Sequence, residues 1–182
     1  MEAYLEAYLN SAITQFAYYR KLGERTFEQL NDADLFWRFN DESNSIAIII
    51  RHMAGNMLSR WTDFLTSDGE KNWRNRDTEF EDTVSTRENL MDTWNSGWEC
   101  LFNALNSITP ADWEKTIYIR NEPHRIEDAI NRQLAHYPYH VGQIVHIGKM
   151  ITGAKWHSLS IPKGNSDQYN ADKFANPGDT FK

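Results

Sequence analysis

Two histidines four residues apart, His136 and His140, have the spacing of a metal-binding pair. On a helix, side chains at this separation lie on one face with their Cβ atoms about 5–6 Å apart. Two imidazoles can close that span around one ion at about 2.0–2.1 Å per bond. The spacing alone is weak evidence, because solvated histidine pairs are common. Pro138 lies between the two histidines, and a proline in a helix interior destabilises the helix by about 3 kcal/mol.

A third ligand has to come from another element, and His52 in the stretch IIIRHMAGN is the candidate. Periodicity argues against it, because His52 lies roughly 130° from the apolar centre of its helix, in line with Asn56, Ser59 and Asp63. In its favour, the preceding IAIII makes the helix start apolar on all sides, and Gly55 would permit another backbone to approach closely. The residues alone therefore do not decide whether His52 is a metal ligand or part of a solvent-facing polar surface.

Other chemistry is sparse. Cys100 is the lone cysteine and is typical of a small buried hydrophobe. The acidic stretch EFED, Glu79 to Asp82, is typical of a solvated loop. No glycine-rich phosphate loop, GxSxG elbow or CxxC pair is present, so covalent catalysis has no visible nucleophile.

The histidines have to be positioned by helices. Apolar residues recur at helical spacing in four segments, which predicts an all-α, four-helix bundle built from about 3–30, 46–66, 87–108 and 126–150. Ser45 and Thr86 are expected to cap the second and third helices, and Gly153 to end the fourth. The connections are longer than usual bundle loops and argue against a plain up-down-up-down arrangement. Residues 116–126 suggest a minor β-hairpin.

The fourth helix is expected to run through Pro138. Its apolar stripe, which includes Ile130, Leu134, Tyr137 and Val141, keeps its phase on both sides of the proline. A continuous helix with a local bend or bulge therefore fits better than two helices, and the proline leaves the Leu134 carbonyl without its usual partner. His136 and His140 then lie about 80–120° from the apolar centre, beside the core.

Size and charge narrow the class of protein. The 182 residues fit one domain, with the bundle over residues 1–155 and a C-terminal arm over 156–182 packed on it. A net charge of −7 offers no basic field for nucleic acid, and no apolar run approaches the roughly eighteen residues that span a bilayer. We expect a cytoplasmic protein that binds neither nucleic acid nor membrane.

The combination of RHMAGN in the second helix with HYPYHVGQI in the fourth resembles the DinB-like superfamily of damage-inducible and YfiT-like metalloenzymes. The likeness covers nearly the whole chain, including RWTDF, DGEK and LSIPKGNS, and looks closest to a branch of unknown function. The resemblance implies an up-down-down-up bundle, frequent homodimers, and a divalent metal, nickel or zinc, held by three histidines. Carried over residue by residue, the ligands are His52, His136 and His140.

The resemblance also implies a class of reaction, since characterised relatives include transferases and isomerases that use low-molecular-weight thiols. We expect a metal-dependent enzyme in which a water or thiol binds at an open metal position and loses its proton. Asn56 and Gln143, one turn beyond His52 and His140, are candidates to orient ligands or substrate, or are plain surface residues. The alternative is a non-catalytic metal-binding or dimerisation module induced under stress.

Overall fold

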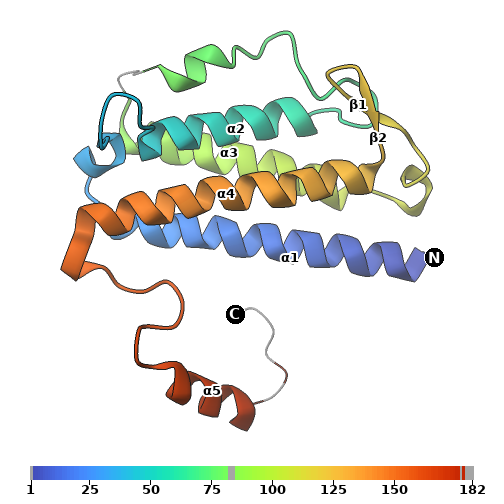
Figure 1. The fold of residues 1–182 in the computed structure, drawn as a ribbon. Helices are drawn as coiled ribbons and strands as arrows, with labels where there is room; N and C mark the ends of the chain where they lie inside the picture. The colour runs from blue at the N-terminus through green and yellow to red at the C-terminus, as the bar shows by residue number, and fades with distance from the viewer. Residues whose placement is uncertain (1, 82–84, 177, 179–182) are drawn as a thin grey trace.

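The computed structural model of the chain describes residues 2–81, 85–176 and 178. Its core is a four-helix bundle (Figure 1), built from α1 (Glu2–Phe27), α2 (Ile46–Trp61), α3 (Arg87–Asn106) and α4 (Ile126–Thr152). Helices α1 and α4 run in one direction and α2 and α3 in the other, which is the up-down-down-up arrangement (Figure 1). No helix among the described residues is long and apolar enough to cross a lipid bilayer.

Local signals in the sequence set the helix ends. The Ser45 hydroxyl accepts a hydrogen bond from the Ile48 backbone N–H (3.2 Å) at the start of α2. The Thr86 hydroxyl accepts one from the Asn89 N–H (3.2 Å) at the start of α3. These bonds satisfy amides that the first helical turn leaves without partners. At the end of α4, Gly153 has φ of 55°, which glycine adopts without a Cβ clash. The three predicted helix boundaries are confirmed.

The core lies between the four helices and is rich in aromatic side chains. The ring centroid of Tyr137 lies 5.9 Å from that of Phe16 and 5.9 Å from that of Trp98. All three side chains are fully buried. Helices α2 and α3 approach closely at Gly97, where a Cβ would lie 2.8 Å from the Ala54 Cα. The apolar stripes therefore bring α2 and α4, which carry the histidines, against one shared core.

Helix α4 is continuous through Pro138, as the phase of its apolar stripe predicted. Tyr137 is fully buried, so the stripe holds at the proline itself. Proline has no N–H, so the Leu134 carbonyl lacks the amide that would normally bond it within the helix. The local bend at this point stays a prediction.

The connection between α2 and α3 folds back over α2 and contains a short 3₁₀ helix, η2 (Asp77–Phe80). The connection between α3 and α4 holds the predicted hairpin, in which β1 (Ile117–Ile119) pairs antiparallel with β2 (Glu122–His124). The Gly69 N–H donates to the Tyr118 carbonyl (2.8 Å) and ties the two connections together. Three further 3₁₀ helices lie at Ala33–Phe36 (η1), Pro110–Asp112 (η3) and Gly153–Lys155 (η4).

The C-terminal arm contacts the bundle at its beginning and then leaves it. Arg25 of α1 donates to the Leu159 carbonyl (2.7 Å), and the Gln29 side chain bonds the backbone of His157. Further on, the sequence forms a helix that we did not predict, α5 (Ser166–Ala175), whose side chains are all exposed. Figure 1 shows α5 apart from the four long helices. The domain boundary at residue 155 stays a prediction.

Candidate metal centre

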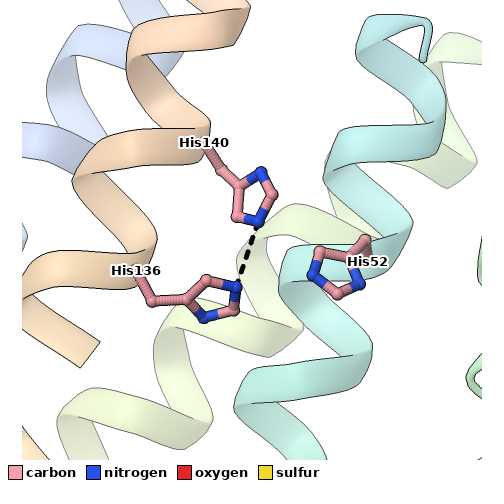
Figure 2. Close-up of side chains that lie close together, drawn as sticks. All are labelled: His52, His136 and His140. Atoms are coloured by element: carbon pink, nitrogen blue, oxygen red, sulfur yellow. Dashed lines mark hydrogen bonds between the residues drawn. The ribbon is translucent and has the colours of Figure 1, made fainter. Parts of the chain in front are cut away.

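Three histidines from two helices meet on one side of the bundle (Figure 2). His136 and His140 project from α4, and the His52 ring faces them from α2. The Nε2 atoms of His136 and His140 lie 3.0 Å apart, and one nitrogen from each of the three rings lies within 4.8 Å of the others. Two nitrogens bound to one ion at about 2.0–2.1 Å lie at most about 4.2 Å apart. At the tetrahedral angles of a zinc site the nitrogens lie about 3.3–3.4 Å apart, so the most distant pair would have to approach by up to about 1.5 Å to share one ion.

His52 lies where periodicity did not place it. Its helical position indicated a polar, solvent-facing side of α2, yet only 6% of the residue is exposed, and Asn56 and Ser59 on the same face are buried too. The reason is tertiary: η2 packs on this face, with the Phe80 ring centroid 5.0 Å from that of His52, and α4 lies beside it. The polar face of α2 is thus buried between η2 and α4, and it contributes His52 to the site.

The second nitrogen of each ring is hydrogen-bonded to a side-chain oxygen. The Nδ1 partners are Glu79 for His52 (2.9 Å), Gln133 for His136 (3.2 Å) and Gln143 for His140 (2.8 Å). The Glu79 carboxylate only accepts, so Nδ1 of His52 is the donor. The Gln143 amide nitrogen donates to the Tyr139 hydroxyl (3.2 Å), which leaves its oxygen for His140. Such bonds fix the ring orientation and direct Nε2 toward a metal.

If Nδ1 is the donor in both His136 and His140, lone pairs face each other at the centre of the cluster. With Nδ1 of His136 and of His140 donating, both Nε2 atoms carry a lone pair, and these atoms lie 3.0 Å apart. Two lone pairs at this distance repel unless a proton or a cation lies between them. Neutral imidazole nitrogens are favoured ligands of zinc and nickel. The donor set therefore fits a divalent transition-metal ion.

Burial keeps the α4 histidines in the form that binds metal. Burial, followed by the neighbouring His140 and His52, lowers the pKa of His136 to about 3. Burial also lowers the pKa of His140, although its bond to Gln143 acts in the opposite direction. Because metal ligation requires neutral imidazole, both rings can bind an ion near neutral pH without losing a proton.

Glu79 connects His52 to a buried arginine. Burial acts to raise the pKa of Glu79, but the hydrogen bonds from His52 and Arg74 outweigh it and hold the pKa below its usual range. Arg74 donates to both carboxylate oxygens (2.7 and 3.0 Å), and its side chain is only 2% exposed. A Cβ at Gly55 would overlap the carboxylate. The absence of a side chain at Gly55 thus leaves room for the Glu79 side chain. We had expected a backbone segment, rather than a side chain, to approach this glycine.

Asn56, which we considered as a residue that orients ligands or substrate, forms a hydrogen bond to Tyr137. Its side-chain oxygen accepts a hydrogen bond from the Tyr137 hydroxyl (3.0 Å), which in turn accepts one from the Trp61 indole N–H (3.1 Å). The chain joins α2 to α4 across the core, because Asn56 and Trp61 lie on α2 and Tyr137 on α4. Asn56 therefore helps to hold together the two helices that carry the histidines.

One cavity borders two of the three histidines, and a second lies beside Gln143 without reaching any of them. One of about 300 Å³ is bordered by His52 and His136. Another, of about 470 Å³, is bordered by Gln143 and by the aromatic side chains of Trp37 and Phe39. The first cavity therefore leaves space for a small molecule beside His52 and His136.

Sequence reasoning did not identify three polar neighbours of the histidines: Glu79, Arg74 and Gln133. Glu79 belongs to the EFED stretch, which we interpreted as solvated, yet it is buried because η2 packs on α2; Asp82 of that stretch lies outside the described residues. Gln133 did carry a usable signal. It precedes His136 by three residues, the same separation at which Gln143 follows His140.

Comparison with known proteins places the chain in a family. Residues 4–165 match the family described as "Protein of unknown function (DUF1572)". No curated protein and no solved structure matches the chain. The match spans the four-helix bundle and all three histidines. The chain therefore belongs to the DUF1572 family of proteins of unknown function.

Proposed function

We propose that this protein is a divalent-metal-dependent enzyme related to the DinB-like superfamily, with His52, His136 and His140 as the ligands of nickel or zinc. The observation that carries the proposal is the orientation of the rings. Each Nδ1 is held by a side-chain oxygen, and the Nε2 atoms of His136 and His140 meet at 3.0 Å. One metal ion bound by the ring nitrogens that face each other would account for this arrangement.

A catalytic role is supported by the limited number of protein ligands. Among the described residues, the cluster of candidate metal-binding groups contains the three histidines and no fourth His, Cys, Asp or Glu. Structural zinc sites usually have four protein ligands, whereas catalytic sites keep a position for water or substrate. A divalent ion in this site would lower the pKa of a water or thiol at that position. The reaction classes that follow are thiol transfer and hydrolysis.

The protein's own groups orient the site. Glu79 fixes the His52 ring, Gln133 and Gln143 fix the two rings of α4, and the buried guanidinium of Arg74 keeps Glu79 ionised. Because these bonds are already formed, the rings would keep their orientation when an ion binds and would only have to move closer together.

The test uses His136→Ala. We expect the variant to keep its helical circular-dichroism spectrum and to take up less than one zinc or nickel ion per chain. The metal-loaded wild type should transfer glutathione to a chromogenic aryl chloride or hydrolyse p-nitrophenyl acetate, and the variant should do neither above background. Collapse of the fold in His136→Ala would instead indicate a structural ion, and inactivity of the metal-loaded wild type with both probes would contradict the assigned reaction classes.

A further inference from the structure

An arginine-rich cavity lies beside the histidine cluster. The cavity of about 300 Å³ that borders His52 and His136 is also lined by five arginines from four separate segments: Arg60, Arg74, Arg76, Arg120 and Arg132. Arg60 comes from α2 and Arg132 from α4, Arg74 and Arg76 from the α2–α3 connection, and Arg120 from the hairpin turn. The chain as a whole carries a net charge of −7, so this concentration of positive charge runs against its overall balance.

Acidic side chains neutralise only part of this charge. Arg74 pairs with Glu79 (2.7 Å), and Arg120 pairs with Glu70 (3.0 Å). Within residues 2–81 and 85–176, no carboxylate forms an ion pair with the three other arginines of the cavity, Arg60, Arg76 and Arg132. An excess of positive charge therefore faces the space next to two of the candidate metal ligands.

Arg60 is the most informative of these residues. It is only 5% exposed, and its Nε and Nη1 atoms are buried without a hydrogen-bond partner among the described residues. Burial of an unpaired guanidinium is costly, and such groups in native proteins call for an explanation. Burial lowers the pKa of Arg60, and the nearby positive charge of Arg132 acts in the same direction. An anion in the cavity would offset the charge of Arg60, and its buried Nε and Nη1 atoms would bond the anion only after the side chain moves.

We propose that this cavity binds the oxyanion group, a carboxylate or a phosphate, of a small-molecule substrate, with Arg60 and Arg132 as its principal partners. Guanidinium groups match the planar edges of carboxylates and phosphates with paired N–H donors. The volume of about 300 Å³ is at the lower end of the range of small-molecule sites. This assignment of a substrate class rests on the proposed function, because the cavity borders His52 and His136 and would place the rest of the substrate near the ion.

The experiment measures anion binding by metal-free protein, so that phosphate cannot bind through an ion. Chelator-treated and dialysed wild type is titrated calorimetrically at low ionic strength with inorganic phosphate in one arm and succinate in the other. We expect saturable binding of one anion per chain, and the arm with the higher affinity identifies the group. Arg60→Gln and Arg132→Gln should each weaken that binding about tenfold or more, the loss typical of a hydrogen bond to a charged group.

Arg125→Gln is the matched control, because Arg125 is exposed at the start of α4, pairs with Glu127 and does not line the cavity. Its anion affinity should equal that of the wild type. Arg132 is exposed, so Arg132→Gln should fold and remains informative even if Arg60→Gln does not. The absence of saturable wild-type binding in both arms, or an unchanged affinity in the two cavity variants, would overturn the proposal.

Metal content separates this inference from the proposed function. Arg132→Gln should still take up one zinc or nickel ion per chain. Anion binding without metal uptake by the wild type would support the arginine site and refute the metal centre. Metal uptake without anion binding would support the metal centre and refute the arginine site.

Discussion

A single methyl group on α2, added by Gly55→Ala, should weaken metal binding without touching a histidine. The new Cβ would overlap the Glu79 carboxylate, and the next atom it meets, the Glu79 Cδ, would lie 2.9 Å away. The overlapped oxygen, Oε1, accepts from the Arg74 Nε (2.7 Å), and a Glu79 side chain that swings aside also gives up the Oε2 bond to the His52 Nδ1 (2.9 Å). His52 would lose the group that sets its tautomer and ring orientation.

The magnitudes can be worked out separately for affinity and stability. Loss of a partner behind a metal-binding histidine lowers metal affinity roughly 10–100-fold. Loss of one hydrogen bond to a charged group costs about 1.5–3 kcal/mol, and replacing a helical glycine with alanine returns about 1 kcal/mol. Counting the His52 bond alone, we expect Gly55→Ala to be at least about 0.5–2 kcal/mol less stable than the wild type in the absence of metal, and any loss of the Arg74 bonds to Glu79 adds to this.

The assay is a competition titration of zinc against a chromogenic chelator, combined with urea unfolding of the metal-free proteins. Gly142→Ala is the matched control, because Gly142 also lies in a helix, only two residues from His140, and a Cβ there meets nothing within 4 Å. The control should bind zinc with wild-type affinity and be slightly more stable. If Gly55→Ala behaves like Gly142→Ala in both measurements, the reasoning about Glu79 is wrong.

Two further predictions concern stability. Tyr137→Phe removes the hydroxyl that links α2 to α4 and leaves two buried polar partners unsatisfied, so urea unfolding should show a loss of about 1–3 kcal/mol; an unchanged midpoint would contradict this. Asp112 has its pKa lowered to about 2 by hydrogen bonds from Lys115 and Thr109. Because the folded-state pKa lies below that of the unfolded chain, this stabilisation is present above about pH 4 and is lost as the pH falls toward 2. The difference in free energy of unfolding between the wild type and Asp112→Asn should shrink over that range, and a constant difference would contradict the assignment.

The sequence predicted the features that local rules determine. Ser45 and Thr86 marked helix starts because their hydroxyls satisfy free amides, and Gly153 marked an end because it tolerates positive φ. The apolar stripe through Pro138 predicted a continuous α4, because the benefit of burying a whole helix face exceeds the local cost of one proline.

What the sequence did not predict depends on contacts between distant segments. His52 lies on the polar face of α2, and only the connection that folds back over that face buries it, so no periodicity within α2 could place it. The partnership of Glu79 with His52 spans 27 positions, and the arginines of the cavity come from four segments without a shared motif. Helix α5 buries none of its side chains, so it produces no apolar stripe to detect.

The central claim is that His52, His136 and His140 bind one divalent transition-metal ion. The most direct measurement is elemental analysis of protein purified without an affinity tag, for the wild type and for His52→Ala, before and after incubation with nickel or zinc and gel filtration. We predict one nickel or zinc ion per wild-type chain and markedly less in His52→Ala. A wild-type protein that carries no transition metal and takes up neither ion would contradict the claim.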